Sequence, residues 1–381
     1  MGYAGPLVKH IADLPTPAVL VESSRLTRNL SRMQAMANAH GLRLRPHAKT
    51  HKSPTIAALQ IQRGAVGICC AKLGEAEVFA DAGIADIRLP YPINPVNADR
   101  VLALMDRVRL SFIVDDPAVA AEWSGIMARA GKTLDILVKV DVGFHRCGVN
   151  PEAPDVVDAI AGIAAMPGLS FRGLLSHAGH AYHAESEYAL ANITTDETAI
   201  LVDLAKALRD RGVKVDEISV GSTPTARFAS SQRGITEMRP GNYVFLDRTQ
   251  VGLGSATHAN CALFIVATVV SRPAPDRVIL DCGSKTLTSD GARGFVALPG
   301  YGSVFMSSDE DSPDPSILIE RLSEEHANCR VQESSPLRPG DRVRVLPNHA
   351  CTVANLTDQL WLADDSGVLK SLPVAARGRI W

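Results

Sequence analysis

The sequence lacks a charge bias of either sign and any long apolar run. Its 381 residues carry 39 Lys and Arg against 41 Asp and Glu, a formal net charge of −2 at pH 7. Such a balance gives no electrostatic attraction for nucleic acid or for an anionic membrane surface. No segment approaches the roughly 20 uninterrupted apolar residues that a membrane span needs. We therefore expect neither a nucleic-acid partner nor insertion in a membrane.

The N-terminal segment and the cysteines bear on the compartment. The opening residues, MGYAGPLVKHIADLPTPAVLV, lack the long apolar stretch after a basic start that marks a secretory signal. Seven cysteines, an odd number scattered along a large chain, do not indicate a disulfide framework. We expect a cytoplasmic protein, in which a cysteine is free to act as a ligand or as a reactive thiol.

Strand-like and helical patterns alternate over the first two thirds of the chain. A composition of 46% hydrophobic and 21% charged residues is that of a globular protein long enough for two domains. Strand and helix repeated at this spacing predict a (β/α)8 barrel of the TIM type, and a doubly wound sheet is the alternative that periodicity leaves open. The expected strands are residues 18–22, 42–47, 67–71, 86–90, 110–116, 135–143, 170–179 and 217–223.

After about residue 245 the pattern changes to strands separated by Pro, Gly and Asp turns, with few helical stretches. The strand-like segments are CALFIVATVVSRP, DRVILDCGS, DRVRVLPNHACTV and QLWLADD. No low-complexity tract or long linker precedes them. We predict an α/β protein with a barrel over residues 16–245 and a mostly β domain over residues 246–381, which residues 1–15 could join.

The stretch RPHAKTHK, residues 45–52, places five basic side chains in eight positions. Such a run is often a solvated face or an anion-binding patch. A lysine held among other cations, however, has its charged form disfavoured, so its pKa falls toward the range of a nucleophilic amine. Lys49 follows an expected early strand, at the end where barrel enzymes place their active sites. It is therefore our candidate nucleophile.

Two glycine-containing segments late in the expected barrel are candidate anion sites. VGSTPTA (220–226) follows a strand, and RPGNYVF (239–245) follows shortly after it. Backbone amides in such turns suit a phosphate, and Ser222 and Thr223 add hydroxyl donors. Each segment alone is more typical of an ordinary turn. Combined with a nucleophilic lysine, they indicate pyridoxal 5'-phosphate (PLP).

Eight short motifs carry a resemblance to a known family. They are TPAVLVE, RPHAKTHK, VDVGFHRCGV, SHAGHAYH, VGSTPTA, RPGNYVFLD, SEEHA and LPNHACTVANL. In this order, they resemble the D-threonine aldolase and D-serine dehydratase family, which has the alanine racemase type of fold. The resemblance implies a PLP-dependent lyase acting on a small D-amino acid. It also implies a homodimer in which the partner's β domain completes the active site.

The resemblance assigns roles to individual residues. Lys49 would be the Schiff-base lysine, and Arg146 would face the pyridine nitrogen and keep it unprotonated. A ring in that state is a weaker electron sink, and in this family a divalent metal assists. The cofactor-binding residues implied are Lys49, Arg146, Gly221, Ser222, Thr223, Gly241, Asn242 and Tyr243.

The segment NHAC holds the candidate metal ligands, His349 and Cys351. On an extended segment, positions i and i+2 point to the same face, so the two side chains would project together. Two ligands leave positions open for water and substrate, as a catalytic site requires, and thiolate with imidazole favours zinc over manganese or magnesium. The residues alone favour a core cysteine beside a turn histidine, because two ligands do not make a metal site. The resemblance favours the metal site, with Asn348 and Arg45 as further candidates for substrate or supporting contacts.

The pair of His349 and Cys351 also indicates which reaction the protein catalyses. In the family that the sequence resembles, aldolases typically carry His-x-Asp at this point and dehydratases carry His-x-Cys. Dehydration of a D-serine, D-threonine or D-threo-3-hydroxyaspartate type substrate to an oxo acid and ammonia is therefore our main prediction. Retro-aldol cleavage to glycine and an aldehyde is the alternative, with His177 or His180 as the base.

Two other classes stay open. A racemase would need a second base, for which Tyr301 is a candidate. A non-catalytic PLP-binding barrel would lack a β domain as large as residues 246–381.

Overall fold

The computed structural model describes residues 9–306 and 311–381. These residues form two compact units, which are described separately. The barrel unit comprises residues 32–49, 54–241 and 378–381. The β unit comprises the described residues up to 31 together with 50–53 and 242–377. The part of the chain that the structure describes contains no helix long and apolar enough to cross a membrane.

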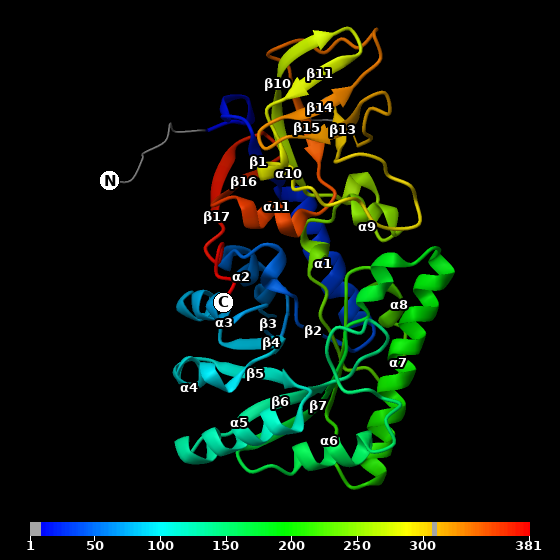
Figure 1. Ribbon diagram of the computed structural model, residues 1–381. Coiled ribbons are helices and arrows are strands. Elements are labelled where there is room, and N and C mark those ends of the chain that lie inside the picture. Colours follow the sequence, from blue (N-terminus) through cyan, green and yellow to red (C-terminus); the bar gives the residue numbers. More distant parts are fainter. Residues whose placement is uncertain (1–8, 307–310) are drawn as a thin grey trace. The chain divides into compact units, whose positions relative to one another are not determined.

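The barrel unit is built on eight parallel strands (Figure 1), which follow one another in the order β2-β9-β8-β7-β6-β5-β4-β3. A parallel bridge between His47 and Cys69 joins the two ends of this order. The predicted barrel is thus confirmed. The strands are β2 (Arg43–Leu44), β3 (Ile68–Cys69), β4 (Asp86–Pro92), β5 (Arg109–Val114), β6 (Leu134–Lys139), β7 (Leu169–Leu175), β8 (Glu217–Val220) and β9 (Glu237–Met238).

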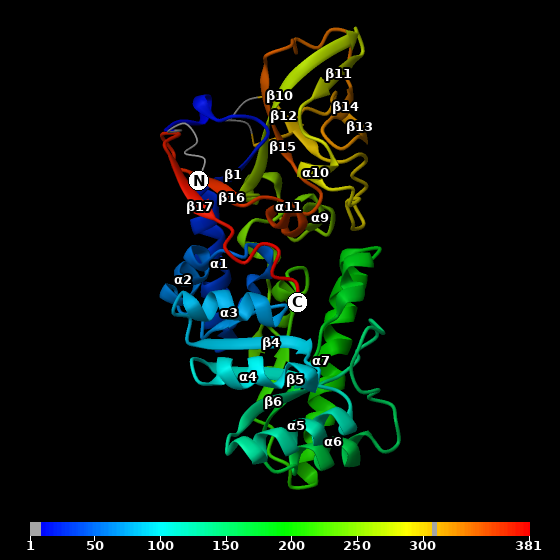
Figure 2. The ribbon, with the colours of Figure 1, turned by 60° about the vertical axis from the view of Figure 1, so that its left-hand side comes forward.

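Helices alternate with these strands and lie around them (Figures 1 and 2). Their ends follow local chemistry: Asp116 caps α5 by accepting from two backbone amides, and Gly131 ends it in the left-handed region. Trp123 of α5 is fully buried and packs edge-on against Phe112 of β5 at 5.1 Å between ring centroids. The helices are α2 (Pro54–Gln62), α3 (Leu73–Asp81), α4 (Ala98–Met105), α5 (Pro117–Ala130), α6 (Val156–Ala164), α7 (Glu187–Asp210) and α8 (Ala226–Ala229). Helix α1 (Ser23–Ala39) begins in the β unit and ends in the barrel unit.

One expected barrel strand belongs to the other unit. Residues 18–22 form β1 (Ala18–Glu22), which pairs antiparallel with β10 (Leu263–Ala274) and parallel with β16 (Gln359–Ala363). The eighth barrel strand is instead β9, which has only two residues and lacks an apolar run. The pattern misled because both sheets bury their strands, and an apolar run does not tell which sheet it joins.

The β unit has more strand than helix, which agrees with the predicted mostly β domain. Its nine-stranded sheet has the order β13-β14-β11-β10-β1-β16-β17, with β15 pairing β10 and β12. The remaining strands are β11 (Arg277–Leu280), β12 (Ser303–Phe305), β13 (Leu318–Leu322), β14 (Ala327–Arg330), β15 (Arg342–Leu346) and β17 (Leu369–Pro373). Its short helices are α9 (Arg248–Gly252), α10 (Ser284–Leu287) and α11 (Ala350–Leu356).

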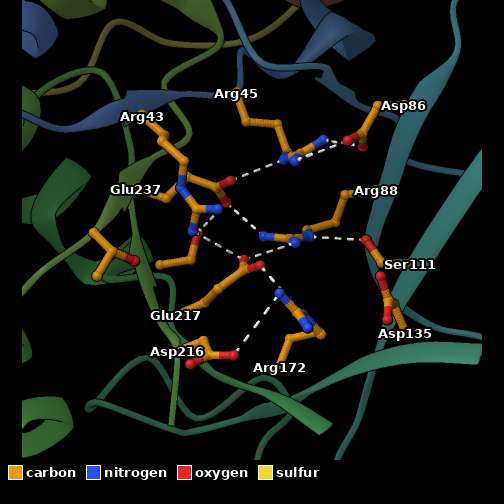
Figure 3. Close-up of polar contacts among 12 residues, drawn as sticks. Arg43, Arg45, Asp86, Arg88, Ser111, Asp135, Arg172, Asp216, Glu217 and Glu237 are labelled. Carbon is orange, nitrogen blue, oxygen red and sulfur yellow. Dashed lines mark hydrogen bonds and ion pairs between the residues drawn. The ribbon is translucent and has the colours of Figure 1, made fainter. Parts of the chain in front are cut away.

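Charged side chains, rather than apolar ones alone, fill part of the barrel interior (Figure 3). Arg45 and Arg88 point toward Glu237 from two sides, at 2.9 and 2.5 Å, and Arg88 also bonds Glu217 at 2.9 Å. Burial alone would raise the pKa of Glu237, but Arg88 and Arg45 lower it to about 2. Arg45, one of the predicted candidates for substrate or supporting contacts, is thus engaged in an ion network that holds the barrel strands together.

Candidate active site

The five basic residues of RPHAKTHK lie in three environments. Arg45 points into the ion network of the barrel interior, while His47 and Lys49 follow β2 at its carboxyl end. His51 and Lys52 belong to the β unit. Lys49 is exposed in a single 3-10 turn, and its backbone amide donates to Nδ1 of His47 at 3.4 Å. The other basic residues of RPHAKTHK therefore do not all lie around Lys49.

The positive charge near Lys49 comes from distant segments of the barrel unit. Burial lowers the pKa of His47 well below its ordinary value, and the charges of Lys49, Arg239 and Arg146 lower it further. Lys139, at the end of β6, has its pKa lowered to about 7 by burial and then by Arg239. The arginines of this group of basic side chains would stabilise an anionic group such as a phosphate. Sequence reasoning missed Lys139, because nothing in the β6 pattern marks it as different from a strand residue pointing outward.

His177, which follows β7, is held as a neutral ring. Its Nδ1 donates to the carbonyl oxygen of Gly221 at 2.9 Å, since a carbonyl only accepts. Burial, followed by the charges of Lys49 and Lys139, lowers the pKa of His177 well below its ordinary value. With Nδ1 protonated, Nε2 carries the free lone pair. His177 can therefore act as a base through Nε2.

His180 has a different environment. It lies in a 3-10 turn, and its ring is close to Gly143 in the loop after β6. Burial lowers its pKa, and the nearby charges are those of Asp141, His145 and Asp196. Lys49 acts on His177 and is absent from the charges that act on His180. Of the two predicted histidines, His177 is thus the one grouped with the lysine.

Two arginines contribute to the cationic cluster. The predicted Arg146 is exposed, and its guanidinium lies 5.3 Å from the centroid of the Phe144 ring. Arg239, directly after β9, is buried and donates to Ser219 Oγ at 2.8 Å and to the carbonyl oxygen of Ser176. Its motif, RPGNYVF, stood out for its glycine, so the arginine at its start was overlooked.

The predicted phosphate segment after β8 is buried, and its glycine has a packing reason. A Cβ at Gly221 would lie 2.7 Å from the backbone nitrogen of Arg239, so β8 and β9 can approach only with glycine here. Ser222 Oγ bonds Thr225 Oγ1 at 2.9 Å. Gly221, Ser222 and Thr223 thus sit on the strand ends beside the buried Arg239, where backbone amides and a cation suit a phosphate.

The second predicted phosphate segment divides between the units. Gly241 ends the barrel unit, while Asn242 and Tyr243 begin a 3-10 turn of the β unit. The side chain of Asn242 donates to Asp247 Oδ2 at 2.6 Å and lies 3.6 Å from Cys351 Sγ. The amide group of Asn242 thus contacts the predicted metal ligand Cys351, and only the backbone of Asn242 stays a candidate for the phosphate.

The predicted metal ligands, His349 and Cys351, do come together, but by a different route. His349 is extended and occupies the N-cap position of α11 without a capping hydrogen bond from its side chain, and Cys351 lies in the first turn of that helix. The expected extended segment through Cys351 is therefore wrong. His349 Nδ1 bonds Asp290 Oδ2 at 2.8 Å, which leaves Nε2 for the hydrogen bond between His349 and Cys351.

His349 and Cys351 stabilise each other's charged forms. Burial disfavours the imidazolium, but the charge of Cys351 and its hydrogen bond raise the pKa of His349 to about 10. Burial likewise raises the pKa of Cys351, while His349 outweighs it and lowers that pKa below its ordinary value. A thiolate and an imidazole nitrogen are the donor atoms that zinc prefers, and a bound cation would replace the imidazolium proton.

Other groups of the β unit support the sulfur. Thr50 Oγ1 lies 3.2 Å from Cys351 Sγ, so with Asn242 it gives the thiolate a second donor. Asp247, fully buried, accepts from the backbone amide of Ala350 at 2.9 Å, and its charge raises the pKa of His349 and of Cys351, so it supports the imidazolium rather than the thiolate. No group of three or more His, Cys, Asp or Glu residues suited to a metal occurs within residues 9–306 and 311–381. His349 and Cys351 offer one imidazole nitrogen and one sulfur as ligands.

Comparison with known proteins places the chain in a family. It belongs to the family described as alanine racemase, N-terminal domain, whose model matches residues 21–249, and the model described as putative serine dehydratase domain matches residues 262–363. This confirms both the predicted resemblance and the predicted fold class.

Individual relatives cover nearly the whole chain. The chain is similar to a D-threonine aldolase of Arthrobacter sp, with 35% identity over 377 residues, 97% of this chain and 94% of the relative. It is equally similar to a D-threo-3-hydroxyaspartate dehydratase of Delftia sp. (strain HT23), with 35% identity over 373 residues, 94% of this chain and 97% of the relative. The solved structure of that dehydratase matches at a TM-score of 0.90, with 31% identity over 96% of this chain and 99% of the other. Two further solved structures of a D-threo-3-hydroxyaspartate dehydratase, a histidine-to-alanine mutant and a cysteine-to-alanine mutant in the metal-free form, match at the same TM-score of 0.90.

Proposed function

We propose that the protein is a PLP- and metal-dependent lyase that dehydrates a D-3-hydroxy amino acid to an oxo acid and ammonia. The observation that carries the proposal is the convergence of His349 and Cys351, a thiolate and imidazole pair, in a chain whose barrel presents Lys49 at a strand end. Both curated relatives described above are named for lyase reactions of D-3-hydroxy amino acids. The substrate class is therefore a small D-amino acid with a 3-hydroxyl group.

The barrel residues fit PLP, on which the family depends. When bound, the cofactor withdraws electrons from the substrate's Cα. Lys49 provides the amine that holds the cofactor and, once released, accepts the α-proton at Nζ. The backbone of Gly221, Ser222, Thr223, Gly241, Asn242 and Tyr243 would hold the phosphate. Arg146 remains the predicted neighbour of the pyridine nitrogen, and the buried Arg239 joins it as a candidate because both act in the same cationic cluster.

The metal would be held by His349 Nε2 and Cys351 Sγ. This donor set favours zinc, with manganese or magnesium as alternatives. The bound ion supplies a Lewis acid that makes the substrate's 3-hydroxyl a feasible leaving group. In the two dehydratase mutants described above, the histidine and the cysteine that were changed to alanine are two positions apart, as His349 and Cys351 are here.

Retro-aldol cleavage is the second candidate, and His177 is the observation that favours it. A neutral histidine with a free Nε2 could remove the proton of the 3-hydroxyl, which is the step that an aldolase needs. The products would then be glycine and an aldehyde. Cys351 favours dehydration, because the family's aldolases typically have aspartate at the corresponding point of the motif.

Mass spectrometry of the products formed from D-serine, D-threonine and D-threo-3-hydroxyaspartate tests these alternatives together. Oxo acid and ammonia support the dehydratase, whereas glycine and an aldehyde support the aldolase. L-isomers would indicate a racemase, and unchanged substrates a non-catalytic PLP-binding protein. We further infer a homodimer, and sedimentation that showed a fully active monomer would contradict it.

A further inference from the structure

Asp290 contacts the expected metal pair from a segment far away in the sequence. It lies between α10 and β12, and its Oδ2 accepts from His349 Nδ1 at 2.8 Å across 59 positions of the chain. The same oxygen accepts from Thr352 Oγ1 at 3.3 Å. The sequence offered no pattern that would connect Asp290 with the motif NHAC.

This contact decides which nitrogen of His349 is available. A carboxylate accepts hydrogen bonds, so Nδ1 carries a proton and Nε2 is the nitrogen left for Cys351 or for a cation. Histidine ligands of metals usually donate their other ring nitrogen in this way, which fixes the ring's orientation and increases its basicity.

The backbone of Asp290 is itself held beside His349. Asn348, which precedes His349, is 1% exposed and donates from Nδ2 to the carbonyl oxygens of Asp290 and Gly300, at 2.9 Å each. Arg248 donates to Asn348 Oδ1 at 2.5 Å and to the carbonyl oxygen of Pro299 at 2.9 Å. Asn348, a predicted candidate for substrate contact, thus uses its side chain to connect two segments.

This anchoring distinguishes the pair from an ordinary surface contact. The side chains of His349 and Asp290 are 37% and 39% exposed, and an ion pair at such exposure normally contributes little. Much of that weakness comes from the entropy lost when two mobile groups are ordered. Here the hydrogen bonds of Asn348 already hold the backbone of Asp290 in place.

We propose that Asp290 is a positioning residue that orients His349 for metal binding. The inference rests on the proposed function, because it takes His349 and Cys351 as the ligands. Asp290 holds the proton on Nδ1, so that Nε2 is the nitrogen directed to Cys351 Sγ and the one that a metal would take in place of its proton. Asn348 and Arg248 in turn hold the segment that carries Asp290.

Zinc affinity, measured on the full-length protein by competition with a chromophoric chelator, tests the proposal without an activity assay. Asp290→Asn should bind zinc about 10 to 100 times more weakly than the wild type. Thr352→Val is the matched control, because it removes the other donor to Asp290 Oδ2 and leaves the bond to His349. Its affinity should stay close to that of the wild type.

A second measurement separates orientation from general damage to the fold. Nitrogen-15 NMR of zinc-loaded protein should show His349 protonated at Nδ1 in the wild type and a loss of that uniform tautomer in Asp290→Asn. Should Asp290→Asn not fold, Asp290→Ser keeps a polar side chain too short to reach Nδ1, and it should show the same loss of affinity. Equal zinc affinity in the wild type and the folded Asp290 variant would overturn the role of Asp290 alone. A wild type that binds no zinc would overturn the proposed metal site and, with it, this inference.

Discussion

The barrel unit and the β unit use charge in opposite ways at their candidate sites. Around Lys49 and His177, the barrel unit gathers basic side chains, including the buried Lys139 and Arg239. In the β unit, a thiolate and an acidic group flank one histidine at the start of α11. The first arrangement suits an anionic cofactor and the second suits a cation. The cofactor and metal residues can therefore be tested one set at a time.

Lys49→Ala should give the largest effect. Activity toward D-3-hydroxy amino acids should fall by several orders of magnitude, because the change removes both the covalent attachment and the base. In the wild type, reduction with borohydride followed by peptide mapping should find the cofactor on the peptide with Lys49. Lys285→Ala is the control, since Lys285 is exposed and pairs with Glu325. Attachment at Lys285 or Lys52 would contradict the assignment.

Removal of the metal should disable the metal site of the β unit and leave the PLP site of the barrel unit intact. EDTA should abolish activity without loss of bound PLP, and added zinc should restore it, because the predicted cofactor contacts of the barrel unit include no metal ligand. Cys351→Asp replaces a soft ligand by a hard one, so we expect less ammonia from D-serine and a shift toward manganese or magnesium. A gain of glycine release from D-threonine would support the aldolase relationship. Full activity of Cys351→Asp in the presence of EDTA would show that the metal pair has no part in catalysis.

Glu237→Gln should destabilise the barrel unit. It leaves Arg45 and Arg88 buried without their shared carboxylate, which costs about 3–5 kcal/mol. Glu320→Gln, which breaks the exposed pair with Arg330, should cost at most about 1 kcal/mol. Thermal unfolding of both variants and the wild type, followed by circular dichroism, measures the difference.

The same ion network predicts a pH dependence of stability. The pKa of Glu237 is lowered from 4.5 to about 2 in the folded state, so the unfolded chain binds a proton first as the pH falls. The stability that Glu237 contributes is complete above pH 4.5 and is lost as the pH falls through about 2. The difference in melting temperature between the wild type and Glu237→Gln should therefore shrink over this range. A constant difference would show that the charge of Glu237 is not what matters.

Thr50→Val should give the smallest effect, and it tests whether the hydroxyl group of Thr50 supports the sulfur of Cys351. It removes one hydrogen-bond donor to Cys351 Sγ, worth about 1 kcal/mol, or about a fivefold loss of zinc affinity. Thr50→Ser keeps the hydroxyl group and should bind zinc like the wild type. Equal affinity of the valine variant would show that Asn242 alone supports the thiolate.

Local sequence patterns predicted which segments form strands and helices better than they predicted which strands pair with one another. The alternation of strand and helix correctly indicated a barrel followed by a β unit, yet it counted β1 as a barrel strand and overlooked β9. The count of eight was right although one member was wrong. Strand pairing is a contact between distant segments, and a two-residue strand such as β9 carries no periodicity.

At the candidate site, too, the sequence identified individual residues better than it identified their contacts. The motifs pointed to Lys49, His177, His349 and Cys351, and the structure groups the first two in the barrel unit and the last two in the β unit. The groups that support them were overlooked, because some lie in motifs that stood out for other residues and the others lie outside the motifs. They are Lys139, Arg239, Thr50, Asp247 and Asp290.

By itself, the sequence determined the family, the alternation that makes a barrel, and the residue types that carry the chemistry, because these depend on side-chain identity and local periodicity. Only the tertiary structure decided which strand joins which sheet and which cations lie near Lys49. It also decided that Arg45 belongs to an interior ion network and that Asp290 meets His349. These outcomes depend on contacts between residues far apart in the chain, and their energies arise from burial and charge pairing that exist only after folding.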